Sequence, residues 1–293
     1  MKKISKEKIF DIINVFLLFI ILIIILYPLI YVVSASFSDA QQVIAGNIRL
    51  LPIDFTTESY QSVFKNENIF RSFINTVTVT IFGTLLNLVL TTLAAYPLSR
   101  KDLKGRDKIM IFITITMFFS GGIIPTYLVV QKLGLINHLS ALILPGAISS
   151  YNLIIMRTFF QSSIPYELQE SAFIDGCSNT RTLLSIILPL SAPILAVIAL
   201  YYAVAHWNAY FNAMLYLTER ELYPLQMILK EILIQSQMSE MMDMNADSLY
   251  RQAMLGETIK YAVVVVSSIP MLIIYPFIQK FFVKGIMIGA VKG

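Results

Sequence analysis

The sequence predicts an all-α integral membrane protein with six transmembrane helices. Of its 293 residues, 57% are hydrophobic and only 14% are charged, whereas soluble domains carry about 25% charged residues. The charges are also segregated, because six windows without Asp, Glu, Lys or Arg approach or exceed the roughly 20 residues that cross a bilayer. The windows are continuously apolar, which favours helices over the alternating pattern of a membrane β-barrel. They cover residues 12–38, 72–99, 109–131, 133–156, 182–218 and 261–279.

The basic residues predict a multi-pass membrane protein with both termini in the cytoplasm. With the N-terminus inside, 14 of the 22 Lys and Arg residues lie on the cytoplasmic side, five of them in the loop 100–108. Cytoplasmic loops of membrane proteins are enriched in such residues. The net charge of +4 is therefore interpreted as topology and not as a nucleic-acid interface. The first apolar run, Ile12 to Val33, is too long for a signal peptide.

Each window supplies one predicted helix, and glycine and proline interrupt the third one. Gly121, Gly122 and Pro125 are expected to break the third helix, because glycine and proline inside a membrane helix release backbone groups. The fourth predicted helix contains Pro145 and Gly146. We divide the chain into a first helix with an external loop (1–71), a helical core (72–282) and a cytoplasmic tail (283–293). The core contains a polar hairpin (163–189) and an external loop (212–258). The predicted helices are Phe10–Val33, Phe73–Leu98, Ile109–Val130, Leu139–Met156, Ile194–Phe211 and Ile259–Phe281.

The polar segment 163–189 predicts a helix–turn–helix at the cytoplasmic face. Pro165 suits the first turn of a helix. Gly176 is expected to end that helix with a positive φ. Ser178 is expected to cap a second helix that ends before Pro189. From the residues alone, the hairpin is either an interfacial element without a partner or a docking site.

The spacing within this hairpin resembles the signature of the transmembrane subunits of binding-protein-dependent ABC importers. The family pattern is E-A-A, three residues, G, nine residues, I-x-L-P, and here Ser171 stands for the first alanine while Ile186 falls in register. In that family the hairpin couples the permease to a separate ATPase subunit. The resemblance therefore implies that the ATPase-coupling residues are Glu167, Glu170, Ser171, Ala172, Asp175, Gly176, Leu188 and Pro189.

The whole chain is similar to the smaller permease subunit of the maltose importer and its carbohydrate-importing relatives. Further motifs carry this likeness: Asn75-Thr76, the segment 96–100, the segment 121–125 and Trp207-Asn208. The likeness implies a type I importer of the bacterial plasma membrane that translocates an oligosaccharide or related glycan. Its partners would be a second homologous permease, two ATPase subunits holding ATP and Mg²⁺, and an extracytoplasmic solute-binding protein. The tail residues Gly289, Val291, Lys292 and Gly293 are expected to contact the ATPase, or else to form a frayed end.

Polar and aromatic residues in the core are candidates for a substrate path. Aromatic faces and amides suit sugar rings, although Trp and Tyr near a helix end also form the usual aromatic belt. The external loop is rich in methionine, including Met227 and Met238, which suits an adaptable contact with the binding protein or an interfacial helix. The path candidates are Asn75, Gly121, Gly122, Tyr202, Trp207 and Asn208.

Several function classes lack the residues they need. The chain has no G-x-x-x-x-G-K-[ST] phosphate loop, no H-E-x-x-H metal motif and no G-x-S-x-G elbow, so we expect no enzyme activity and no cofactor or metal in this chain. The single Cys177 rules out a disulfide within the chain. No charge lies deep within a predicted span, which favours a neutral cargo. Import of an amino acid, phosphate or polyamine by the same fold stays an alternative, and a membrane assembly protein is a weaker one.

Overall fold

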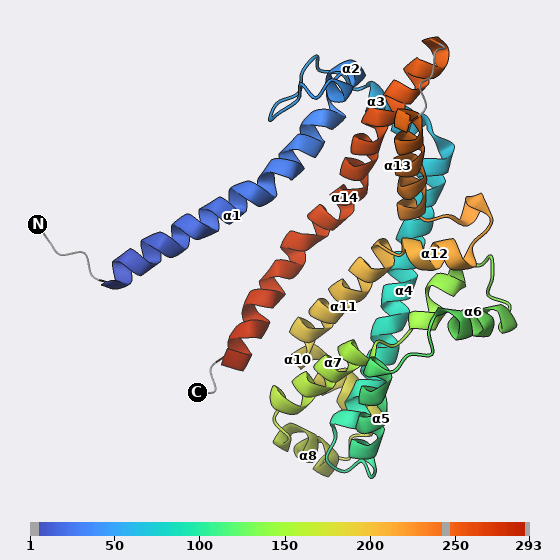
Figure 1. Cartoon of the computed structure of the whole chain (residues 1–293). Coiled ribbons are helices and arrows are strands. Elements are labelled where there is room, and N and C mark those ends of the chain that lie inside the picture. The colour runs from blue at the N-terminus through green and yellow to red at the C-terminus, as the bar shows by residue number, and fades with distance from the viewer. Residues whose placement is uncertain (1–5, 242–246, 291–293) are drawn as a thin grey trace, which may run out of the picture. The chain divides into compact units, whose positions relative to one another are not determined.

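The computed structural model describes residues 6–241 and 247–290, and all regular elements in this part of the chain are helical (Figure 1). The predicted all-α class is confirmed. The elements are α1 (Lys6–Ser36), α2 (Ala40–Ile44), α3 (Glu58–Lys65), α4 (Glu67–Ser99), α5 (Arg106–Phe118), α6 (Ile123–Lys132), the 3-10 turns η1 (Leu139–Leu142) and η2 (Leu144–Gly146), α7 (Ser150–Ser162), α8 (Glu167–Ile174), α9 (Asn179–Thr182), the π-helical turn η3 (Leu183–Ile187), α10 (Leu188–Leu190), α11 (Ala192–Trp207), α12 (Tyr210–Tyr216), the 3-10 turn η4 (Arg220–Leu222), α13 (Leu225–Met241) and α14 (Asp247–Ala290).

The membrane spans are either single long helices or bent pairs of shorter ones. Three helices are long and apolar enough to cross a bilayer: α1, α4 and α14. Three further pairs pass the same test but bend, by 111° between α5 and α6, by 52° before α7 and by 84° before α11. Counting each pair as one span gives six, the number predicted from the sequence.

The bends show where the predicted helix bounds hold and where they are wrong. The third span breaks at Gly122, whose φ of +86° suits glycine, as expected. The fourth helix is not the predicted Leu139–Met156: two 3-10 turns come first, and α7 starts only after Ser149, whose side chain accepts a hydrogen bond from the Asn152 amide. The fifth helix starts after Ser191 and ends at Trp207, four residues short of the prediction.

Most of the described residues in the predicted external loop 212–258 are helical, which agrees with the helical alternative for this segment. It contains most of α12, then η4, α13 and the first turns of α14. Of its methionines, Met227 lies in α13.

The described chain forms two compact units that share helices α4, α13 and α14. The first unit covers the chain up to Phe70 together with Leu229–Ile269, and the second covers Arg71–Ile228 and the chain from Pro270. In the first unit, the loop after α2 is tied to the end of α1. The Ser34 hydroxyl donates to the Leu50 carbonyl at 2.7 Å, and Phe37 stacks on Phe55.

The second unit is organised around one apolar cluster that joins four segments. It brings together α4, α7, α11 and the second half of the polar hairpin, as Figure 1 shows for the helices themselves. Burial of such side chains contributes roughly 1.5–3 kcal/mol each. The hairpin is therefore attached to the membrane helices by its own apolar residues. The buried members are Ala95, Tyr96, Met156, Phe160, Ile164, Leu183, Ile187, Ile194, Ile198 and Tyr202.

Candidate functional site

The turn of the polar hairpin has the geometry that its glycine predicts. Gly176 has φ +73°, and the amide of Cys177 donates to the Ala172 carbonyl at 2.9 Å while the Gly176 amide donates to Phe173 at 3.1 Å. This pair of hydrogen bonds is a Schellman motif, which satisfies the last carbonyls of α8. Ser178 then caps α9 by accepting from the Arg181 amide at 3.3 Å. Both end signals predicted from the sequence are confirmed.

Helix α8 presents two different faces. Phe173 is 74% exposed and Ile174 is 84% exposed, and the acidic residues Glu167, Glu170 and Asp175 of the same hairpin are also exposed. Exposed aromatic and aliphatic side chains rimmed by charges are typical of protein–protein interfaces. The first helix therefore offers an anchor of two apolar side chains to a partner.

The opposite face of α8 packs on the chain itself. Ala172 is 4% exposed and Gln169 is 8% exposed. We expected Ala172 to admit a partner, but its small side chain instead allows α8 to approach its own bundle. Ser171 is exposed and donates its hydroxyl to the Leu168 carbonyl at 3.2 Å.

The second half of the hairpin is buried, which fixes the hairpin to the bundle. Leu183 and Ile187 enter the apolar cluster, and Leu188 packs against it. The predicted stop before Pro189 is wrong, because Pro189 lies in the first turn of the short α10, where a missing N–H is tolerated. The chain turns only at Ser191, whose hydroxyl donates to the Ile187 carbonyl at 2.6 Å.

Arg100, at the end of α4, ties the α4–α5 loop to the hairpin. Its guanidinium donates two bonds to the Asp102 carboxylate, at 2.8 and 2.7 Å, and one to the side-chain oxygen of Asn179 at 2.8 Å. A fourth bond, at 3.2 Å, reaches the Tyr96 hydroxyl. The hydrogen bond to Arg100 lowers the pKa of Asp102, and the same bond raises the pKa of Arg100. A planar fork of donors suits this bidentate arrangement.

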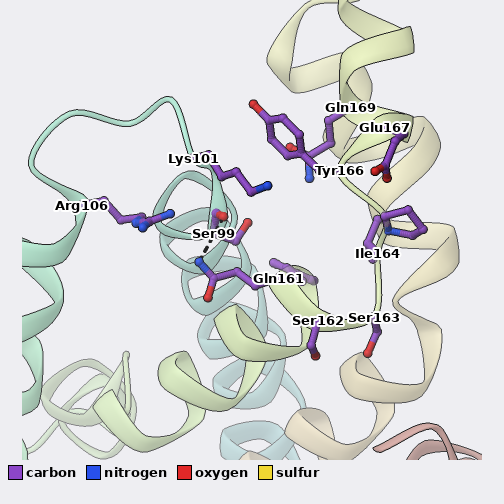
Figure 2. A pocket seen from close by; sticks show the side chains of 12 residues that line it. Ser99, Lys101, Arg106, Gln161, Ser162, Ser163, Ile164, Tyr166, Glu167 and Gln169 are labelled. Atoms are coloured by element: carbon purple, nitrogen blue, oxygen red, sulfur yellow. Dashed lines mark hydrogen bonds between the residues drawn. The ribbon is translucent and has the colours of Figure 1, made fainter. Parts of the chain in front are cut away.

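A pocket of about 600 Å³ lies between the inner face of α8 and the α4–α5 loop (Figure 2). Its polar lining includes Lys101, Arg106 and Gln169, and Phe160 and Ile164 belong to its apolar wall. Sequence reasoning missed this pocket, because its two sides are more than fifty residues apart in the chain.

A buried polar stripe lies on α4 where it meets α11. The Asn87 amide lies 3.0 Å from His206 Nε2, and the Thr91 hydroxyl lies 2.7 Å from the Tyr202 hydroxyl. Tyr202 also accepts from the Ser149 amide at 3.0 Å, which connects the stripe to α7. The spacing of four residues between Asn87 and Thr91 places them on one helical face.

The predicted substrate-path residues do not form one group in the structure. Asn75 donates to the carbonyls of Glu221 and Tyr223 at 2.8 and 3.2 Å, and Trp207 is buried edge-on against Phe73. The Asn208 side chain donates to its own helix at Val204. Tyr202 belongs to the buried stripe, and Gly121 and Gly122 lie in the bend between α5 and α6. A role in substrate passage stays a prediction for these six residues.

The tail prediction falls mostly outside the described residues. Val291, Lys292 and Gly293 are not described, and Gly289 lies in the last turn of α14. Among the described residues, no three His, Cys, Asp or Glu side chains are grouped so that they could hold a metal ion.

Comparisons with known proteins match the whole length of the chain. Residues 79–288 match the family model described as "Binding-protein-dependent transport system inner membrane component". The Bacillus subtilis (strain 168) "Polygalacturonan/rhamnogalacturonan transport system permease protein YtcP" is 43% identical over 98% of this chain and 100% of its own length. "Protein LplC" of the same organism is 41% identical over 98% of this chain and 96% of its own length.

One solved structure shares both the fold and the sequence. A chain in the crystal structure of a bacterial ABC transporter involved in the import of the acidic polysaccharide alginate superposes with a TM-score of 0.85. The two are 34% identical, and the match covers 96% of this chain and 100% of the other.

Proposed function

This chain belongs to the family of binding-protein-dependent transport system inner membrane components, and on that premise we propose that it is the permease subunit of a type I ABC importer for an acidic oligosaccharide. The single observation that carries the proposal is a hairpin with two faces. Its first helix exposes Phe173 and Ile174, while its second half is buried in the bundle core. A separate ATPase is the partner that such a hairpin serves.

The cargo is proposed from the relatives. One is named for polygalacturonan and rhamnogalacturonan, and the solved relative belongs to an importer of an acidic polysaccharide. The sequence alone favoured a neutral cargo, because no charge lies deep in a span. Neutral donors such as amides, hydroxyls and backbone N–H groups also bind carboxylates, so an acidic glycan is compatible with that composition.

The assembly that follows has this chain beside a second, homologous permease in the plasma membrane. Two ATPase subunits, which hold ATP and Mg²⁺, dock on the hairpins from the cytoplasm. An extracytoplasmic binding protein delivers the glycan on the other side. In this arrangement the N- and C-termini are cytoplasmic, and the chain itself carries out no chemistry.

The proposed mechanism follows from how the hairpin is attached. Movement of the ATPase subunits is received by α8, and Leu183 and Ile187 transmit it to α4, α7 and α11. Closely packed cores switch between discrete arrangements and do not deform continuously. The bundle therefore alternates between inward- and outward-facing states, and each ligand shifts this equilibrium only by its differential affinity.

Substitution of Gly176 tests the proposal, because it strains the turn without a steric clash. A Cβ at Gly176 meets nothing within 4 Å, so Gly176→Ala acts only through the positive φ, at a cost of about 1–2 kcal/mol. We expect uptake of labelled oligogalacturonate to fall at least ten-fold while membrane insertion is unchanged. Gly134→Ala is the matched control, because Gly134 has φ +69° and equally open space outside the hairpin. Equal uptake by the two variants would count against the proposal.

A further inference from the structure

The pocket lies on the opposite side of α8 from the two exposed apolar residues that we propose as the ATPase anchor. Gln169 lines the pocket and is 8% exposed, whereas Phe173 and Ile174 lie on the exposed face of the same helix. Residues three apart share a helical face, so Tyr166, Gln169 and Ala172 form the inner face. A ligand in this pocket would therefore contact α8 without competing with a protein docked on its outer face.

Two cations give the pocket its charge. Lys101 and Arg106 both line it, from opposite ends of the α4–α5 loop, and Figure 2 shows Lys101 reaching toward Tyr166 while Arg106 reaches toward Ser99. The ammonium of Lys101 lies over the Tyr166 ring, 4.6 Å from its centroid. Glu167 is the one carboxylate in the lining. Arg106 also pairs with the exposed Asp107 carboxylate at 2.9 Å and donates to the Arg100 carbonyl at 3.3 Å. Attraction of an anion to the pocket therefore depends chiefly on Lys101.

A buried acceptor without a partner is the second feature. The Oε1 atom of Gln169 is buried and accepts no hydrogen bond. Leaving such an oxygen unpaired is unfavourable, so the position favours a ligand that donates a hydrogen bond. Across the pocket the Gln161 amide donates to the Ser99 carbonyl at 3.3 Å, which keeps that wall polar. A ligand that suits both features carries a negative charge for the cations and a hydrogen-bond donor for Gln169 Oε1.

We propose that this pocket binds a small anion bearing hydroxyl groups, held chiefly by Lys101 at its charge and by Gln169 at a hydroxyl. A volume of about 600 Å³ lies within the usual range for small-molecule sites, about 300–1,000 Å³. Two sources have this chemistry: a soluble acidic sugar, and the glycerol phosphate headgroup of phosphatidylglycerol.

A bound ligand would join α8 to the α4–α5 loop and so restrain the hairpin. The loop is already fixed to the second half of the hairpin through Arg100 and Asn179. The pocket lies instead beside the first half, where the outer face docks. Occupancy of the pocket therefore lowers the rate of coupled transport. This effect rests on the proposed function, whereas ligand binding in the pocket does not depend on it.

Calorimetric titration of the full chain in lipid nanodiscs tests the site separately from transport. D-galacturonate is the soluble probe, titrated into nanodiscs of zwitterionic lipid. Phosphatidylglycerol is the lipid probe, counted by native mass spectrometry of chain released from mixed-lipid nanodiscs. We expect Lys101→Met and Gln169→Met each to weaken binding about ten-fold, a change equivalent to about 1.4 kcal/mol. Lys104→Met is the control, because it removes the same charge from the same loop but lies outside the lining.

The outcomes separate the two sources and the two proposals. Binding of galacturonate that depends on Lys101 supports a soluble acid, and retention of phosphatidylglycerol that depends on Lys101 supports the headgroup. The site is overturned if neither probe binds, or if Lys104→Met weakens binding as much as Lys101→Met. Gln169→Met removes no charge, so its result is independent of net electrostatics. A transporter that binds either probe but imports no glycan would contradict the proposed function alone.

Discussion

Arg100 shows how much of the hairpin's position depends on a single side chain. Three of its four side-chain hydrogen bonds remain within the end of α4 and the α4–α5 loop, and the fourth crosses to Asn179 in the hairpin. The Asp102 carboxylate orients the guanidinium, because a bidentate pair allows only one arrangement of the fork. The motif 96–100 was noticed in the sequence, but nothing local pointed to Asn179, which lies 79 residues away.

The pH dependence of the Arg100–Asp102 ion pair follows from the pKa of Asp102. That pKa lies below its ordinary value, so the stabilisation is complete above about pH 4 and is lost as the pH falls through the lowered pKa. We expect Asp102→Asn to lower the midpoint of thermal unfolding at pH 7 by one or two degrees, because the carboxylate is half exposed and solvent screens the pair. The difference from the unmodified chain should vanish at acid pH. A constant difference from pH 7 to pH 3, measured by a dye-based melt in detergent, would contradict this account.

At the scale of elements, the sequence predicted turns and helix ends best where a single residue determines the local backbone. Gly176 and Ser178 set the turn of the hairpin through their own backbone and side-chain chemistry, and Gly122 set the bend between α5 and α6. The inward side of Ala172 and Gln169 was not predictable, because it depends on packing against distant segments. The fourth helix was misplaced for a related reason: 3-10 turns are as apolar as a membrane helix and differ from it only in backbone hydrogen bonding.

The outer face of α8 should contribute binding and not stability. Phe173→Ser and Ile174→Ser remove side chains that are 74% and 84% exposed, so unfolding temperature and membrane abundance should be unchanged. Co-purification with the ATPase should be lost, because central apolar anchors dominate interface energies. Leu51→Ser is the matched control, since Leu51 is 76% exposed in the loop after α2. Retention of the ATPase by the Phe173 and Ile174 variants would place the docking surface elsewhere.

The contact between α4 and α11 depends on the absence of a side chain at Gly83. A Cβ there would lie 2.5 Å from His206 Nε2, so the ring must move and its contact with Asn87 breaks. Forcing extra volume into a packed core costs about 1–3 kcal/mol. We expect Gly83→Ala to lower the thermal midpoint by several degrees. Gly146→Ala, which meets nothing within 4 Å, should leave it unchanged, and equal melting of the two variants would argue against this close packing.

At the scale of the whole molecule, composition and charge predicted the class and the number of spans. Six charge-free windows correspond to three long helices and three bent pairs. They could be predicted because every span needs about 20 mainly apolar residues to cross the hydrocarbon core. The contacts between windows were not predictable. The stripe of Asn87 and Thr91 could have been detected as polar residues four apart in an apolar run, but its partners Tyr202 and His206 are more than a hundred residues away.

The sidedness of the molecule can be tested at its single cysteine, which lies in the hairpin. Cys177 is half-buried directly after the turn, and the charge distribution predicts that this hairpin lies in the cytoplasm. An impermeant maleimide should therefore label Cys177 in inside-out vesicles and not in right-side-out vesicles. In the double variant Cys177→Ser with Leu51→Cys, the exposed position 51 should be labelled with the opposite preference.

Because a protein docked on α8 also covers the turn, added ATPase subunits should slow the labelling of Cys177 and leave the labelling of the cysteine at position 51 unchanged. Labelling of both cysteines from the same side would show that the hairpin cannot meet a cytoplasmic ATPase, which would overturn the proposed coupling.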